Sequence, residues 1–199
     1  MAWYEMIYGT FFEPAETLKR ISHEKQLGYG LAVVIVVYIF GFLFDLGMLR
    51  SSLPQIQELT SLSINASNSY WFYGLIGLPV AILSWFIMSS IYAMLGSLIC
   101  NRQNPEGIMS ALAFSTLPAL LSPPLQLIGR SFAWSAFPLF VGTGIMIWIV
   151  VLEVIGLREA LEVDTGQAMA VWFVPLAVVF VVIIFFFLGM VGIFSQLLA

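Results

Sequence analysis

Long apolar runs alternate with shorter polar segments along this chain. Five of the runs are long enough to cross a bilayer, because about 20 mostly apolar residues span roughly 30 Å of hydrocarbon. None of them alternates with a period of two, so each run is predicted to be an α-helix and not a strand. The predicted spans are residues 27–49, 71–100, 107–129, 133–157 and 168–194.

The polar segments between the runs are mostly short, and only the connection over residues 50–70 is longer. Short connections make neighbouring helices antiparallel. The pattern therefore predicts an all-α membrane protein, in which residues 26–199 form one compact bundle of five transmembrane helices. Residues 1–25 precede this bundle as a separate cytoplasmic or interfacial segment.

The segment before the first span carries a helical signal of its own. Proline is favoured at the first position of a helix, so Pro14 is expected to open one. Leu18 and Ile21 then fall on one face, and Thr17 belongs to the same short helix. We expect this amphipathic helix to lie at the membrane interface. It is either a plain anchor or a helix that binds a partner.

Composition strengthens the assignment to a membrane protein. Apolar residues make up 61% and charged residues 9% of the 199 positions, whereas soluble domains average about 25% charged residues. Nucleic-acid binding is excluded because it needs clustered Lys and Arg, and the chain has 7 of these against 11 acidic residues. The chain has one His and one Cys, too few for a zinc-type metal site. We expect no metal and no cofactor.

Lys and Arg residues are distributed unevenly between the two ends of the predicted spans. Cytoplasmic loops carry an excess of these residues. We therefore expect a cytoplasmic N-terminus, an outer C-terminus and, in a prokaryote, a location in the inner (plasma) membrane. Five basic residues fall on the N-terminal side, namely Lys19, Arg20, Lys25, Arg102 and Arg158, and two on the other, Arg50 and Arg130.

Two acidic residues, Asp45 and Glu153, fall within the predicted spans, near opposite membrane faces. An ionisable residue inside a membrane is a candidate for function by default. One interpretation is that each forms an ion pair near a boundary; the other is a role in moving protons or a polar substrate. The candidate ion-pair partners are Arg50 or Arg130 for Asp45, and Arg102 or Arg158 for Glu153.

The third span is the most irregular of the five. Pro118 removes a backbone hydrogen bond and predicts a kink, and the pair Pro123 and Pro124 is expected to end or break the helix. Broken helices often line binding sites in transporters, but they also occur as passive bends. No span contains a His that could activate a Ser nucleophile, so we expect no enzyme.

Small residues recur every four positions in two of the spans. Ser89, Ala93 and Ser97 share this spacing in the second span, as do Ala111 and Ser115 in the third. Such faces permit close approach of helices. They predict tight packing within the chain, or a contact with another membrane protein or a second copy.

Over about residues 11–195, the chain resembles the Yip1 family of small multi-pass membrane proteins. The opening Pro14-Ala15-Glu16-Thr17-Leu18-Lys19-Arg20-Ile21 is similar to the family's Pro-x-x-Thr-hydrophobic-x-x-Ile pattern. Residues 107–121, with Ser115 and Pro118, resemble its third span. Residues 148–168, with Ile155-Gly156-Leu157-Arg158 and Gln167-Ala168, resemble its fourth-span exit and re-entry.

The resemblance implies five spans, a cytoplasmic N-terminus and a compact, prokaryotic-type member. Eukaryotic relatives work in Golgi and endoplasmic reticulum trafficking with Rab GTPases through a longer cytoplasmic tail, which we do not expect in this compact member. We therefore expect a non-enzymatic scaffold that organises the membrane or binds a partner, with residues 1–25 as the contact. The alternative is a small transporter or permeation component that uses the kinked third span and Asp45 or Glu153.

Overall fold

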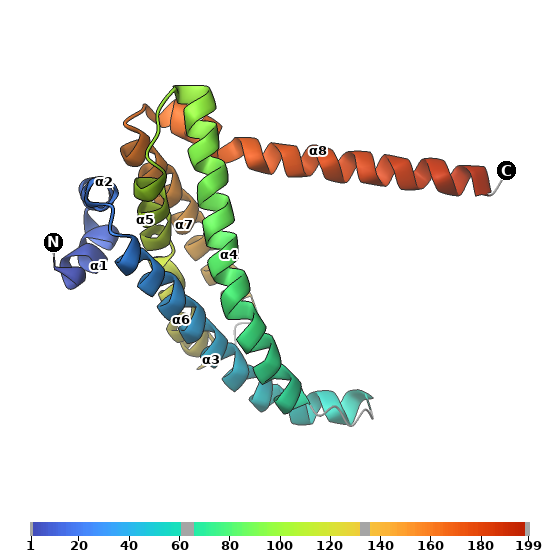
Figure 1. Cartoon of the computed structure of the whole chain (residues 1–199). Coiled ribbons are helices and arrows are strands. Elements are labelled where there is room, and N and C mark those ends of the chain that lie inside the picture. The colour runs from blue at the N-terminus through green and yellow to red at the C-terminus, as the bar shows by residue number, and fades with distance from the viewer. Residues whose placement is uncertain (1, 61–65, 132–135, 198–199) are drawn as a thin grey trace.

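The computed structural model describes residues 2–60, 66–131 and 136–197, and its regular structure in these ranges is helical (Figure 1). The all-α prediction is confirmed for this part of the chain. In chain order the elements are α1 (Trp3–Phe12), α2 (Pro14–Glu24), α3 (Leu27–Thr60), α4 (Ala66–Cys100), α5 (Pro105–Ser115), the 3-10 helix η1 (Leu117–Leu121), α6 (Ser122–Ser131), α7 (Phe137–Leu161) and α8 (Thr165–Leu197).

Five helical segments of the described chain are long and apolar enough to cross a membrane. They match the five predicted runs, although the first residues of the predicted span 133–157 lie outside the described residues. The helices α3 and α4 extend beyond the predicted ends of their spans, because polar residues end an apolar run without ending a helix. The five segments are Leu27–Met48, Gly74–Cys100, Pro105–Gly129, Phe137–Leu161 and Thr165–Leu188.

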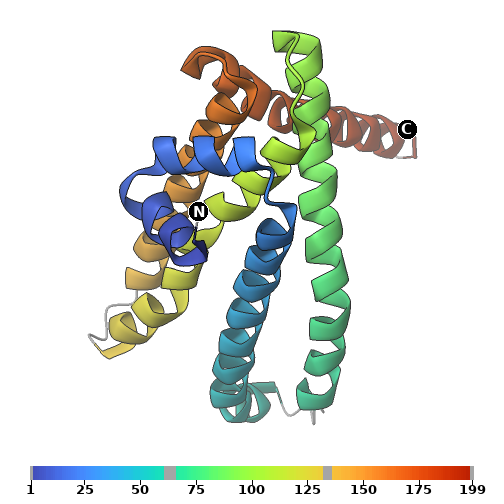
Figure 2. The same ribbon diagram turned by 60° about the vertical axis from the view of Figure 1, so that its left-hand side comes forward.

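The N-terminal segment forms two helices, α1 and α2, where the sequence predicted a single one. The break falls at Glu13, whose backbone lies outside the helical region at φ −135° and ψ 59°. A residue before proline is disfavoured in helical conformation, and Pro14 then opens α2. Figure 2 shows the resulting pair lying across the ends of the longer helices.

The third run is three elements, α5, η1 and α6, and not one helix. Pro118 lies in η1, where α5 has already ended at Ser115. Pro123 and Pro124 were expected to end or break the helix, but they occupy the first turn of α6. Proline is tolerated there because the amide hydrogens of a first turn have no helical partner.

The α5 helix is the centre of the packed core, with eight buried residues among its 11. It contacts α2, α3, α4 and α7. Its small side chains permit these close approaches: a Cβ on Gly30 of α3 would lie 3.2 Å from the Ala113 Cβ, and one on Gly156 of α7 would lie 3.2 Å from the Ala111 Cβ.

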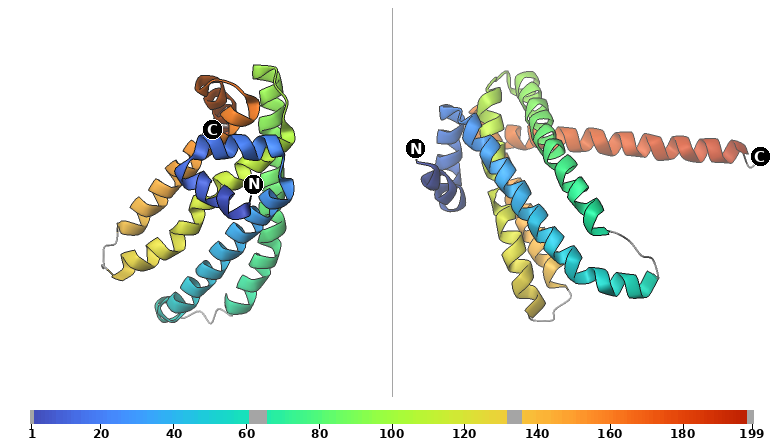
Figure 3. Two further views of the ribbon diagram at one scale, coloured as in Figure 1. Left: turned by 90° about the vertical axis from the view of Figure 1, so that its left-hand side faces the viewer. Right: turned by 60° about the horizontal axis from the view of Figure 1, so that its bottom comes forward.

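The last apolar helix, α8, diverges from the other helices along most of its length (Figure 1). The first turns of α8 pack against α4 and α7 through Ala168 and Val171. Pro175 lies inside α8, and the C-terminal part of this helix extends away from the other helices (Figures 1 and 3). Its side chains from Leu176 to Leu188 are exposed. Hydropathy sets the length of an apolar helix but not its direction, so the sequence pattern did not indicate this divergence.

Candidate functional site

The pair α1 and α2 packs on one end of the α5–α7 pair and forms what we call the N-terminal layer, residues 3–24. Leu18 and Ile21 are buried, Thr17 is 3% exposed, and Met6 of α1 joins the same cluster. The apolar face of α2 therefore packs on protein. A location of this helix at the membrane interface stays a prediction.

Asn104 joins three helix ends beneath this layer. As the N-cap of α5, its Oδ1 accepts a hydrogen bond from the Gly107 amide at 3.1 Å. Its Nδ2 donates to the Ala160 carbonyl near the end of α7 at 3.1 Å and to the Ser22 carbonyl near the end of α2 at 3.4 Å. One amide therefore satisfies backbone groups that helix termini leave without partners.

Gly107 is required by this arrangement. A Cβ at this position would lie 2.2 Å from the Asn104 Nδ2 and 2.6 Å from the Ser22 carbonyl oxygen. The sequence pattern did not single out these residues, although Asn104 followed by Pro105 is a recognisable helix start, with a capping residue and then proline at the first position.

Charged side chains surround this corner, where α2, α4 and α7 end. Lys25, Asn101 and Glu162 end these helices with positive φ angles of 50°, 52° and 54°. Lys25 pairs with Glu106 at 3.2 Å, and His23 lies 3.5 Å from Glu162. We call this cluster the charged corner.

Glu153 of α7 bonds to Trp172 of α8: the indole Nε1–H donates to the carboxylate at 2.7 Å. The predicted pair with Arg102 or Arg158 is not formed. Arg158 instead pairs with its neighbour Glu159 at 2.6 Å, and Arg102 is exposed at the charged corner. The partner of this carboxyl group is therefore an indole N–H from the neighbouring helix and not an arginine.

Removing this donor should destabilise the contact between α7 and α8. We expect Trp172→Phe to lower the free energy of unfolding by about 1–3 kcal/mol, because a half-buried carboxyl group loses its hydrogen-bond donor. Reversible unfolding in mixed detergent micelles measures this. In a Glu153→Gln background the same substitution should cost less; an equal loss in both backgrounds would show that Trp172 acts by packing alone.

The other predicted site residues are not brought together around Glu153. Asp45 is exposed on α3, whereas Glu153 lies on α7 and Pro118 in η1. Arg50 and Arg130 are the predicted partners of Asp45, and their side chains lie outside the described part of the structure. The pairing of Asp45 therefore stays a prediction.

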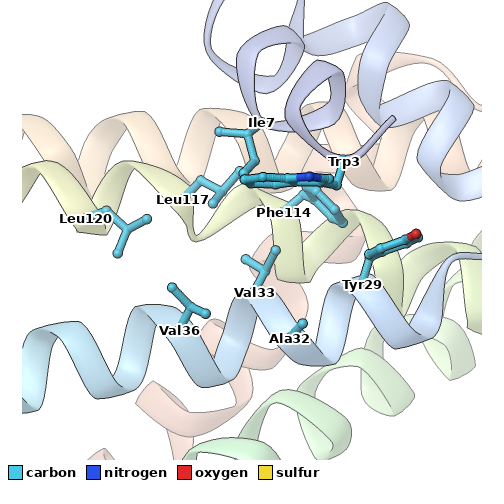
Figure 4. A pocket seen from close by; sticks show the side chains of 9 residues that line it. All are labelled: Trp3, Ile7, Tyr29, Ala32, Val33, Val36, Phe114, Leu117 and Leu120. Atoms are coloured by element: carbon cyan, nitrogen blue, oxygen red, sulfur yellow. The ribbon is translucent and has the colours of Figure 1, made fainter. Parts of the chain in front are cut away.

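The hydroxyl groups before η1 bind the carbonyls at the end of α5. Ser115 Oγ donates to the Ala111 carbonyl at 2.9 Å, and Thr116 Oγ1 donates to the Ala113 carbonyl at 2.7 Å. A cavity next to this bend, between α1, α3 and the α5–η1 segment, has a wholly apolar lining (Figure 4). The bend therefore offers no polar lining to a substrate at this cavity.

Comparison with known proteins identifies the family. The family model described as the Yip1 domain matches residues 8–188, nearly the whole chain. No curated protein and no solved structure matches it. The matched region includes α2, the bend at Pro118 and the α7–α8 connection, where the sequence pattern placed the resemblance. The chain therefore belongs to the Yip1 domain family of multi-pass membrane proteins.

Proposed function

We propose that this protein is a non-enzymatic scaffold of the membrane, and that the outer surface of its N-terminal layer binds a partner. The partner would be another membrane-associated protein or a second copy of the chain. One observation carries the proposal: α1 and α2 are fixed on α5 and α7 by their buried faces, so their opposite faces form a pre-organised surface. Pre-organisation reduces the entropy lost on binding.

The exposed face of α1 has the composition of an interaction surface. Tyr4, Tyr8 and Phe12 are four residues apart and are 61%, 63% and 68% exposed. The rings of Tyr8 and Phe12 stack with centroids 4.5 Å apart. Glu16 and Arg20 of α2 form an ion pair beside this aromatic stripe. Aromatic residues and arginine are enriched at the centres of protein interfaces.

We propose a cytoplasmic location for this surface and an outer location for the C-terminus. Lys25, Arg102 and Arg158 belong to the same end of the molecule as α2, where α4 and α7 end. An excess of basic residues marks the cytoplasmic side. In a prokaryote the membrane would be the inner membrane.

The alternative proposal, a small transporter, has less support. It needs a polar path beside Pro118 and an acidic residue along it. The cavity beside η1 is lined by apolar side chains, and Glu153 bonds to Trp172. In the scaffold proposal, Glu153 and Pro118 serve packing and helix geometry.

Site-directed photocrosslinking in native membranes tests the scaffold proposal. We expect a photoreactive amino acid at Tyr8 to crosslink a defined protein partner. The matched control is the same amino acid at Leu83 of α4, a side chain that is 57% exposed on an apolar face. Deleting residues 1–25 is a poorer test, because it would uncover the α5 and α7 side chains that pack on Leu18 and Ile21.

The pattern of products decides the outcome. Products at Tyr8 that are absent at Leu83 would support a partner on the N-terminal layer. If both positions give the same products, the α1 face is not the contact. Charge reversal by Arg20→Glu should then lower the yield of the crosslinked products at Tyr8. The stability of the purified protein should stay the same, since the ion pair between Arg20 and Glu16 is exposed.

A further inference from the structure

The apolar cavity beneath α1 is bordered by three separate elements. It measures about 290 Å³ and is lined from α1 by Trp3 and Ile7. In Figure 4, these side chains face Val33 and Val36 of α3 across the cavity, and Phe114 lies under the Trp3 ring. The remaining lining residues are Tyr29, Ala32, Leu117 and Leu120.

The position of the cavity along the spans limits what can occupy it. Its α3 wall lies in the apolar segment Leu27–Met48 and its α5–η1 wall in Pro105–Gly129. Both segments are long and apolar enough to cross a bilayer, which favours hydrocarbon over water at the open side of the cavity. Neither water nor a peptide backbone would find a hydrogen-bonding partner on these walls.

One end of the cavity matches the chemistry of a lipid. Tyr29 and Trp3 combine an apolar ring with a polar tip, and such residues locate at the level of lipid headgroups. The Tyr29 hydroxyl points away from the cavity in Figure 4. The volume of about 290 Å³ lies at the lower limit of ligand pockets, roughly 300 Å³, so it suits one acyl chain better than a whole lipid.

We propose that this cavity binds one acyl chain of a bilayer phospholipid, and that Trp3 of α1 covers the bound chain. A lipid in the surrounding bilayer contacts one helix face and exchanges freely. A chain in this cavity contacts α1, α3 and the α5–η1 segment together. The bound lipid would therefore fill the space between the N-terminal layer and the first span.

Photoactivatable phospholipid tests this proposal on the full-length protein in nanodiscs. The probe is a phosphatidylcholine with a diazirine near the end of one acyl chain. We expect label on Phe114, Leu117 or Leu120. We expect Ala32→Phe to reduce that label about tenfold, the change produced by about 1.4 kcal/mol of lost binding energy. Leu31→Phe is the matched control, because Leu31 is 36% exposed on the same helix and does not line the cavity.

Label on the exposed residues Leu83 and Phe86 of α4 provides an internal reference for ordinary bilayer contact. A loss of cavity label in Ala32→Phe, with the α4 label and the Leu31→Phe protein unchanged, would support the proposal. Equal cavity label in both variants would overturn it. Label from a free fatty acid carrying the same diazirine, without label from the phospholipid, would also overturn it.

Discussion

Replacing Asn104 by aspartate should loosen α2 from the rest of the protein while leaving α5 capped. The carboxylate can still accept the Gly107 amide hydrogen, and a negative charge is favourable at a helix N-terminus. It cannot donate to the carbonyls of Ser22 and Ala160, which the amide nitrogen now joins. We expect the free energy of unfolding to fall by about 2–4 kcal/mol, since two acceptors lose their donor.

Limited trypsin digestion reports on α2 directly. Lys19, Arg20 and Lys25 are exposed on α2 and just after it, and local unfolding of this helix would speed cleavage at all three. Asn104→Asp should therefore be cleaved faster at these sites than the wild-type protein.

Gln103→Glu is the matched control for Asn104→Asp. It makes the same change from amide to carboxylate one residue earlier. The Gln103 side chain is exposed, and its amide donates to Ser97 Oγ at 3.1 Å. Its cleavage rate and stability should stay close to wild type. If both variants are cleaved at the same rate, charge at this corner is responsible and the bridging role of Asn104 is wrong.

The helical spans were predictable because each depends on a continuous stretch of sequence. A run of about 20 apolar residues must form a helix in hydrocarbon whatever its neighbours are, and the chain folds accordingly. The α2 helix was predictable for the same reason, since Pro14 and the spacing of Leu18 and Ile21 are local signals. The packing of the apolar face of α2 on α5 and α7, however, depends on tertiary structure and was not predictable from these local signals.

The features that hold the candidate site together depend on residues far apart in the chain. Asn104 lies 82 positions from Ser22 and 56 from Ala160. Glu153 and Trp172 are 19 apart and belong to different helices. The sequence indicated the charge of Glu153 but offered two arginines as its partners, because proximity along a helix says nothing about which neighbouring helix supplies a donor.

A leucine at Gly156 should separate α5 from α7 and disrupt the core. A Cβ at this position would lie 3.2 Å from the Ala111 Cβ and 3.5 Å from Ser115 Oγ. Ala111 and Ser115 are completely buried, so the additional leucine carbons have no free volume. Overpacking of this kind costs about 2–3 kcal/mol. We expect a loss of that size in detergent unfolding, with a lower yield of monodisperse protein.

Gly142 supplies the matched control on the same helix. A Cβ there would meet nothing within 4 Å, and the position is exposed. Gly142→Leu should leave stability unchanged or raise it, because leucine favours helix more than glycine does. Equal destabilisation by the two leucines would show that α7 is sensitive to side-chain bulk in general and not to its crossing with α5.

A compensating change tests the contact itself. Gly156→Ala should destabilise the protein less than leucine does, since a shift of a few tenths of an ångström relieves its single close contact at the Ala111 Cβ. Adding Ala111→Gly removes that Cβ, so the double variant should lose less stability than the sum of the two single variants. Strict additivity would mean that these two positions do not meet, and that the small residues of α5 do not set the distance to α7.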